Sequence, residues 1–336
     1  MPVDTPHPLY ARRAAEWQTL RDCLEGEGAI KAGLDAYLPM TPGQRLDNPN
    51  AGANPDYRAY LQRADFPDLV RLTLDTCVGL VHRRPAGISL PPALRGLFRS
   101  ATPDGLDLPG LHRRLTRNVL LTGRHGLLVE SPPDGADVPY VADYAAESIL
   151  NWKDEGGAPA MVVLREDAPA PERDAFDHGV VPQWRVLSLD DGAYTQRLYR
   201  RGEDGFRAGP PRRPGRGGRA LGFIPFVFVG AADLTPAPEQ APMMPLARLA
   251  LRLYQLSADY RQALFLTSQP TPVISGVEPG QEGLPEQIGA DTVWYLPPDS
   301  RAFYLEVGGQ GIEAHRQAMM DLYDQAQQMG ARLLEG

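Results

Sequence analysis

Lysine is almost absent from this sequence of 336 residues. Lys31 and Lys153 are the only two, so every other basic residue is an arginine. Neither lysine lies in the Gly-Lys-Ser/Thr context of a phosphate-binding P-loop, which excludes a P-loop nucleotidase. With 34 basic and 42 acidic residues, the formal net charge is −8. This balance disfavours a protein that coats nucleic acid through its overall charge.

Cysteine is equally scarce, and long apolar runs are lacking. Cys23 and Cys77 lie far apart and form neither a zinc-ligand spacing nor a disulfide framework, so we expect two small buried side chains. No stretch approaches the roughly 18 apolar residues of a membrane span. The first residues, MPVDTPHPLYARR, lack the apolar centre of a signal peptide, and none is expected.

Proline and glycine are abundant instead, with 34 of each. Together they exceed the roughly 12% share of average proteins, which disfavours one uninterrupted helical bundle. An apolar content of 43% nevertheless supports a folded core. The length predicts more than one module, and the mixture of patterns described below predicts an α+β protein.

The first part of the chain, residues 1–123, is expected to be mainly helical. Apolar side chains at helical spacing predict helices over 9–31, 56–63, 67–82 and 108–121. Asp65 precedes Phe66-Pro67, a sequence typical of a helix start, and is a candidate N-cap for the third of these helices.

Residues 124–242 are expected to form an antiparallel sheet with long loops. Six β-prone runs lie between turn signals, at 127–130, 148–152, 161–165, 181–187, 194–200 and 223–229. We interpret the last as a buried strand. Asp190-Asp191-Gly192 separates two of the runs and predicts a hairpin turn. Residues 200–219, rich in arginine, glycine and proline, are predicted to be one exposed loop.

The arginines of this predicted loop suggest an alternative function. Arginine pairs bidentately with phosphate, so candidate contacts to phosphate or to an acidic partner are Arg212, Arg213, Arg216 and Arg219. A nucleic-acid-binding protein that uses residues 200–219 is therefore one hypothesis. No aromatic residues interleave with these arginines, so readout of bases is not expected, and a solvated loop is the simpler interpretation.

Two long amphipathic helices are predicted over 243–268 and 310–336. Their apolar residues recur at alternating spacings of three and four, which is a heptad seam. The seam positions are Leu246, Leu249, Leu253, Leu256 and Tyr260 in the first helix, and Ile312, Met319, Leu322, Met329 and Leu333 in the second. Their matched lengths predict an antiparallel pair. Residues 269–309 between them hold strand candidates at 271–275, 292–296 and 302–307, which predicts a small β-containing unit.

Polar side chains of the second long helix lie off this seam, namely Gln317, Asp321, Asp324, Gln325, Gln328 and Arg332. The histidines show no metal-ligand spacing, and no Gly-x-Ser-x-Gly or Cys–His arrangement suggests a nucleophile. We therefore expect no catalytic residue, cofactor or metal, although residues distant in sequence can still assemble a site.

Three segments together resemble a family of portal-like proteins of tailed bacteriophages. They are DFPDLVRLTLDTCVGLVHRRP (65–85), LTGRHGLLVES (121–131) and the region that begins QPTPVISG (269–276) and continues as IGADTVWYLPPDSRAFYLEVGGQGIEAHRQAMMDLYDQAQQMGARLL (288–334). The resemblance extends through most of the chain and is weakest over 165–220.

The resemblance implies a portal-type fold: a helical and β wing, a two-helix antiparallel stem and a small α/β clip. Residues 1–123 would be the helical part of the wing, 124–242 its β-rich part, 243–268 stem helix 1, 269–309 the clip and 310–336 stem helix 2. Portal proteins form a ring, usually of twelve subunits, at one capsid vertex. Relatives continue into a tunnel-loop region and a crown, whereas this sequence stops at Gly336, so features of those parts are not transferred.

The resemblance also implies partners and a location. Double-stranded DNA would pass through the ring during packaging and ejection, and the off-seam polar residues of 317–332 would face the channel. The terminase large subunit would dock on the clip, a head–tail connector (adaptor) would later occupy the same end, and the major capsid protein would surround the ring. The protein would be assembled in the host cytoplasm and reside in the virion, with no membrane partner.

Overall fold

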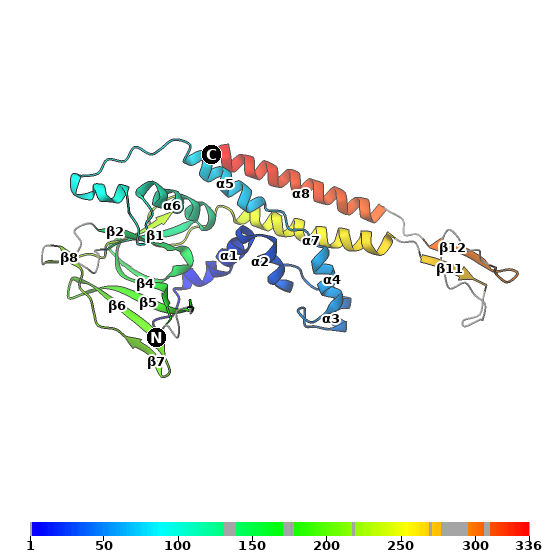
Figure 1. Cartoon of the computed structure of the whole chain (residues 1–336), viewed down its shortest axis with the longest axis horizontal. Coiled ribbons are helices and arrows are strands. Elements are labelled where there is room, and N and C mark those ends of the chain that lie inside the picture. Colours follow the sequence, from blue (N-terminus) through cyan, green and yellow to red (C-terminus); the bar gives the residue numbers. More distant parts are fainter. Residues whose placement is uncertain are drawn as a thin grey trace. The chain divides into compact units, whose positions relative to one another are not determined.

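The computed structural model describes residues 2–130, 139–170, 176, 178–216, 219–268, 271–276, 295–305 and 310–335. The chain is 44% helical and 26% strand, which confirms the α+β class. It divides into two compact units, whose helices and strands are labelled in Figure 1. Unit 1 comprises residues 1–30, 68–250 and 328–336, and unit 2 comprises residues 31–67 and 251–327.

Unit 1 contains α1 (Pro8–Glu25), α5 (Leu69–Val81) and α6 (Leu108–Thr122), with short 3₁₀ helices η2 (Pro92–Phe98) and η3 (Ala146–Ser148). The predicted helix over 108–121 is confirmed. Asp107 caps α6 by accepting a hydrogen bond from the N–H of Gly110, and Gly123 ends the helix in the left-handed conformation. The indole N–H of Trp17 donates to the carbonyl of Thr122 at 3.1 Å, which ties α1 to the end of α6.

The single helix predicted over 9–31 is wrong. The chain forms α1 up to Glu25 and then a separate α2 (Glu27–Ala32). Gly26 separates them with φ at +103°, a conformation that residues other than glycine rarely adopt. The apolar spacing continues across Gly26, which is why periodicity alone did not reveal the break.

The predicted N-cap at Asp65 is also wrong. Helix α5 begins at Leu69, later than predicted, and its N-cap is Asp68, which makes no side-chain capping hydrogen bond. Asp65 belongs to unit 2, where its backbone N–H donates to Oγ of Ser257 (2.9 Å) and its carbonyl accepts from the same hydroxyl (3.0 Å).

Two antiparallel sheets replace the single predicted sheet. The three-stranded sheet has the order β10-β1-β2, with β1 (Arg124–Glu130), β2 (Tyr140–Ala145) and β10 (Phe226–Gly230). The five-stranded sheet follows chain order, with β3 (Ile149–Glu155), β4 (Ala158–Pro169), β5 (Val180–Asp190), β6 (Ala193–Gly202) and β7 (Gly205–Ala208). All six predicted runs overlap strands, whereas β2 and β7 were not predicted.

The run 223–229, interpreted as a buried strand, is buried on one face only. Its strand, β10, is the end strand of the three-stranded sheet. Phe226 and Phe228 are buried, but Val227 between them is 45% exposed and Phe223 lies before the strand at 59% exposure. The alternation follows from the opposite directions of successive side chains in a strand.

The predicted hairpin turn at 190–192 is confirmed. Asp190 pairs with Ala193, which leaves a two-residue loop between β5 and β6. Asp191 and Gly192 both have positive φ, at 53° and 76°. These angles are typical of a type I′ turn, whose twist matches that of the flanking strands.

The two sheets share one apolar core. Leu128, Phe226 and Phe228 of the three-stranded sheet cluster with residues of the five-stranded sheet that include Trp152 and Leu187. A second cluster around Leu150, Val163 and Trp184 involves the N-terminal residues Val3 and Tyr10. Strands β3 to β5 thus contribute side chains to both clusters. Cys23 and Cys77 are buried thiols, as expected, and burial raises the pKa of both.

The arginine-rich segment 200–219 is not the single loop that was predicted. Strand β6 extends to Gly202, β7 follows, and β8 (Gly215–Arg216) pairs with β9 (Arg219–Ala220). Between β7 and β8, the chain runs alongside β6 and forms backbone hydrogen bonds with it. The N–H of Gly209 donates to the carbonyl of Leu198 (2.7 Å), and Arg212 and Gln196 exchange two backbone hydrogen bonds of 2.8 Å. Backbone pairing with β6 therefore orders much of this segment.

Unit 2 contains η1 (Leu34–Ala36), α3 (Pro42–Asp47) and α4 (Pro55–Arg63), together with parts of two long helices, α7 (Met244–Thr267) and α8 (Gln310–Glu335). The predicted helix over 56–63 is confirmed as α4. Asn54 caps it by accepting from the N–H of Tyr57, and the hydroxyl of Tyr60 donates to Asp259 of α7 at 2.5 Å.

Strands β11 (Thr271–Ser275) and β12 (Arg301–Leu305) form an antiparallel hairpin between the two long helices. The candidate at 271–275 is confirmed, and the one at 302–307 overlaps β12, although 306–307 lie outside the described residues. Of the candidate at 292–296, only Tyr295 and Leu296 are described, and neither is in a strand. No helix in the described ranges is long and apolar enough to cross a lipid bilayer.

Candidate functional site

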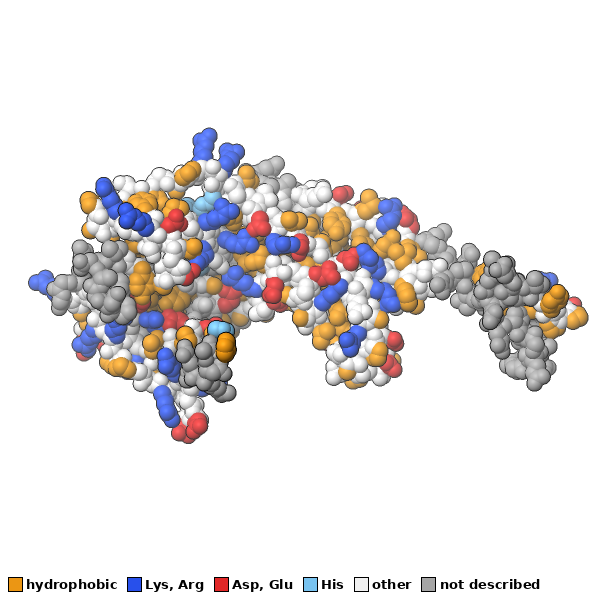
Figure 2. All heavy atoms as spheres, viewed as in Figure 1, with side chains coloured by type: hydrophobic (Ala, Val, Ile, Leu, Met, Phe, Trp, Pro, Cys, Tyr) orange, Lys and Arg blue, Asp and Glu red, His pale blue; other side chains and the backbone are white. Residues whose placement is uncertain are grey.

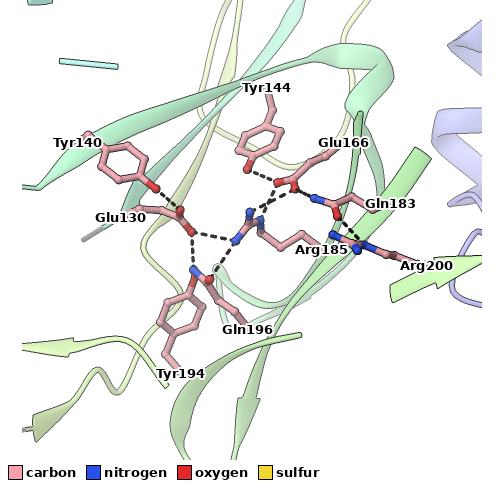
Figure 3. Close-up of polar contacts among 9 residues, drawn as sticks. All are labelled: Glu130, Tyr140, Tyr144, Glu166, Gln183, Arg185, Tyr194, Gln196 and Arg200. Atoms are coloured by element: carbon pink, nitrogen blue, oxygen red, sulfur yellow. Dashed lines mark hydrogen bonds and ion pairs between the residues drawn. The ribbon is translucent and has the colours of Figure 1, made fainter. Parts of the chain in front are cut away.

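Arg185 of β5 lies at the centre of a polar cluster in unit 1 (Figure 3). Its guanidinium forms a two-point contact with Glu166 of the neighbouring strand β4, through Nε to Oε1 (2.6 Å) and Nη2 to Oε2 (3.2 Å). Nη1 donates to Oε1 of Glu130 on β1 (3.3 Å) and to Oε1 of Gln196 on β6 (3.1 Å). One arginine therefore links strands of both sheets.

Glu130 is the second hub of this cluster. Its side chain is only 5% exposed, so its charge needs hydrogen-bond donors. The hydroxyl of Tyr140 donates to Oε2 at 2.7 Å, and Nε2 of Gln196 donates to Oε1 at 2.6 Å. With Arg185, these donors satisfy both carboxylate oxygens (Figure 3).

Further polar residues surround Glu166. The hydroxyl of Tyr144 donates to Oε1 at 2.7 Å, and Nε2 of Gln183 donates to Oε2 at 3.0 Å. Arg200 of β6 then donates through Nε to Oε1 of Gln183 at 3.3 Å. The cluster thus extends from β1 and β2 of the three-stranded sheet to β6 of the five-stranded sheet.

The pKa values of Tyr140, Tyr144 and Arg185 are all raised in the cluster. Burial raises the pKa of Tyr140 to about 12, with a further contribution from its hydrogen bond to Glu130. Burial and the charge of Glu166 raise the pKa of Tyr144. Burial alone would lower the pKa of Arg185, but its hydrogen bonds with Glu166 and the charges of Glu166, Tyr144 and Glu130 raise it instead. At neutral pH both phenols are therefore protonated donors, and Arg185 is charged.

A pocket of about 720 Å³ opens beside the cluster. Five residues belong both to the cluster and to the pocket lining, namely Glu130, Tyr140, Arg185, Gln196 and Arg200. The remaining lining residues come from β6, β7 and the segment that follows, and they are Leu198, Arg207, Ala208, Gly209, Pro210 and Arg212. The pocket combines guanidinium groups with apolar walls.

The residues of this cluster were not singled out from the sequence. In β-prone runs, charges at alternate positions normally face solvent, so Glu166 and Arg185 resemble surface residues. The available signal was that charged and amide residues recur within the runs 161–165, 181–187 and 194–200 and at their ends. Their convergence depends on the packing of two sheets, which the sequence pattern does not specify.

The predicted seam residues of α7 and α8 differ in burial. Leu246, Leu249 and Leu253 are buried, and Leu256 and Tyr260 are half-buried. On α8, the residues Ile312, Met319, Leu322 and Met329 are half-buried, and the side chain of Leu333 lies outside the described residues. On α8, the hydrogen bond from Arg316 to Glu313 raises the pKa of that arginine.

The predicted channel-facing residues are all exposed where they are described, namely Gln317, Asp321, Asp324, Gln325 and Gln328. The side chain of Arg332 lies outside the described residues. The amide of Gln317 donates to Asp321 at 2.8 Å, one turn later. These residues form an acidic and amide-rich surface on α8.

The four predicted phosphate-contact arginines lie within one short segment of the chain. Arg212 lines the pocket, and Arg212, Arg213 and Arg219 are all exposed. Arg216 pairs with Arg219 across β8 and β9, and the side chain of Arg216 lies outside the described residues. On the face seen in Figure 2, basic and acidic side chains are interspersed rather than gathered into one basic surface. In the described ranges, no group of three or more His, Cys, Asp or Glu is placed to hold a metal ion.

Comparison with known proteins finds a family match over residues 242–336, to a family described as a domain of unknown function (DUF4055). No curated protein sequence matches. Among solved structures, a chain from a virion of a native gene transfer agent particle is similar at 13% identity and a TM-score of 0.41, covering 87% of this chain and 73% of that chain. A chain from the neck of an empty gene transfer agent particle is similar at 13% identity and a TM-score of 0.37, covering 80% and 68%. These scores are too low to define the fold.

Proposed function

We propose that this chain is a portal ring subunit, a structural virion protein at a capsid vertex. The observation that carries the proposal is the succession of α7, the β11–β12 hairpin and α8. Two helices of 24 and 26 residues are about 36 and 39 Å long, and a small β unit lies between them in sequence. This is the succession expected of a stem and a clip.

The chemistry of α8 supports a channel role. A channel that passes DNA must not hold it, and rows of basic residues would bind phosphates strongly through counterion release. The exposed face with Asp321, Asp324 and Gln325 keeps such contacts weak. In this proposal the polar face lines the channel through which DNA is packaged and ejected.

The β11–β12 hairpin supports an oligomer. A two-stranded hairpin is marginally stable by itself in water. In the proposed ring, neighbouring subunits complete the clip, so that assembly contributes to its folding. The assembled clip would dock the terminase large subunit and later the head–tail connector, and the major capsid protein would surround the ring. The packaging ATPase is a separate chain in this scheme, and the portal subunit has no catalytic role.

Sedimentation velocity of the purified chain tests this proposal. A ring of about twelve subunits sediments as a single species many times heavier than the 36.8 kDa chain. A species that remains monomeric at high protein concentration contradicts the proposal.

The alternative function, nucleic-acid binding through residues 200–219, has a separate test. It predicts salt-sensitive affinity for DNA that is lost when Arg212, Arg213, Arg216 and Arg219 are replaced by alanine. The portal proposal predicts little change in DNA affinity from these substitutions.

A further inference from the structure

Arg200 and Arg207 lie directly opposite each other on β6 and β7. Opposed residues of antiparallel strands have Cβ atoms about 4.5–5.5 Å apart and project from the same face of the sheet, so like charges in these positions destabilise the pair. Across the described ranges, neither arginine has an ion pair. Arg200 donates to the neutral amide oxygen of Gln183 at 3.3 Å, and Arg207 has no carboxylate partner.

Both arginines line the 720 Å³ pocket. The lining carries four arginines and a single carboxylate, Glu130, and that carboxylate is already satisfied by Tyr140, Gln196 and Arg185. The charge of Arg185 is in turn balanced by Glu130 and Glu166. The positive charge around Arg200 and Arg207 is therefore not balanced by the cluster.

We propose that this pocket binds an organic oxyanion, a carboxylate or phosphate group on a partly apolar body, between the guanidinium groups of Arg200 and Arg207. Arginine holds such groups through paired, charge-assisted hydrogen bonds, and an anion between the two arginines removes their repulsion. Leu198, Pro210 and Tyr140 supply apolar walls for the rest of the ligand.

The shape of the site limits the ligand. A volume of about 720 Å³ is within the range of small-molecule sites. This volume is too small to enclose a nucleic-acid duplex, so we infer a smaller carrier of the oxyanion. The oxyanion therefore comes either from a free small molecule or from an acidic side chain of a partner polypeptide.

Thermal unfolding with citrate or inorganic phosphate, at ionic strength matched with sodium chloride, tests the proposal. A ligand that binds only the folded state raises the Tm, and we expect a rise of several degrees. Arg200→Gln and Arg207→Gln should raise the Tm in the absence of anion, because the repulsion is gone, and should abolish the response to anion. Arg213→Gln loses the same charge outside the pocket and should keep the response.

The proposal is overturned if neither anion stabilises the unsubstituted protein, or if the pocket variants respond as strongly as Arg213→Gln.

The source of the oxyanion is tested by fluorescence anisotropy with a short labelled peptide of glutamate and leucine, beside its glutamine counterpart. Binding of the glutamate peptide alone, displaced by citrate, assigns the site to a partner polypeptide. A response to citrate or phosphate without peptide binding assigns it to a free anion. Duplex DNA binding that requires Arg200 and Arg207 overturns the proposal.

Discussion

Arg124 and Arg185 of unit 1, one buried and one half-buried, have opposite surroundings. Arg185 has two carboxylate partners, and its pKa is raised. Arg124 is 2% exposed, and none of its guanidinium nitrogens has a hydrogen-bond acceptor in the part of the chain that the structure describes. Its guanidinium instead lies 4.1 Å from the centre of the Trp152 ring, and burial lowers its pKa to about 9. The two residues should therefore respond differently to substitution.

Replacing Arg185 by methionine should be strongly destabilising. The change leaves the buried Glu130 and the half-buried Glu166 without their cation, and breaking a buried ion pair from one side costs about 3–5 kcal/mol. Urea unfolding followed by tryptophan fluorescence measures the loss, because Trp17, Trp152 and Trp184 all lie in unit 1. A loss below about 1 kcal/mol would show that the cluster is a surface-like network.

Replacing Arg124 by methionine should leave the free energy of unfolding unchanged or raise it. The substitution removes a buried charge that lacks hydrogen-bond acceptors, and well-packed apolar replacements of buried charges are often neutral or stabilising by about 1–4 kcal/mol. The lost cation–π contact with Trp152 offsets about 0.5–2 kcal/mol of that gain. The same urea experiment measures the difference, and a loss as large as that of Arg185→Met would contradict this account.

Asp143 should make unit 1 sensitive to acid. Burial alone would raise its pKa, but the hydrogen bonds and charges of His125 and Arg114 lower it below the ordinary value. A carboxyl with a lowered folded-state pKa stabilises the fold above its ordinary pKa of about 3.9, and this stability is lost as pH falls through the folded-state pKa. Between about pH 5 and pH 3, the unsubstituted protein should therefore lose more stability than Asp143→Asn. Parallel pH curves in urea unfolding would disprove the effect.

Secondary-structure elements were more predictable than side-chain sites. The helices α4 and α6 and the hairpin turn at Asp191-Gly192 follow from local signals, because apolar spacing, capping residues and glycine act within a few positions. The break at Gly26 was missed because apolar spacing continues on both sides. Strand β2 was missed because its residues are mostly half-buried and alternate little. The Arg185 cluster required knowledge of strand register and of how two sheets share a core.

A charge introduced into the seam of the long helices should destabilise the fold more, the more deeply the replaced side chain is buried. Leu253 is 1% exposed, so Leu253→Asp places a carboxylate where no donor compensates it, at a cost of several kcal/mol. Leu322 is half-buried, so Leu322→Asp should cost less, and Asp321→Asn on the exposed face should change stability by no more than about 0.5 kcal/mol. Thermal unfolding followed by circular dichroism at the helix band gives this order. An unchanged Tm and intact assembly in Leu253→Asp would show that the seam is misplaced.

At the scale of the whole molecule, the acidic net charge and the local arginines have separate roles in this account. The charge of −8 and the acidic and amide face of α8 suit a protein that surrounds DNA without holding it. The arginines that line the pocket are those for which we propose a smaller anionic ligand. The family match at 242–336 covers α7 and α8, the part on which the proposed stem depends.

Negative-stain electron microscopy of the purified chain tests the central claim most directly. The portal proposal predicts ring-shaped particles with a central hole, and Leu253→Asp should abolish them while Asp321→Asn retains them. Monomeric particles without a hole, at the highest soluble concentration, would contradict the proposal.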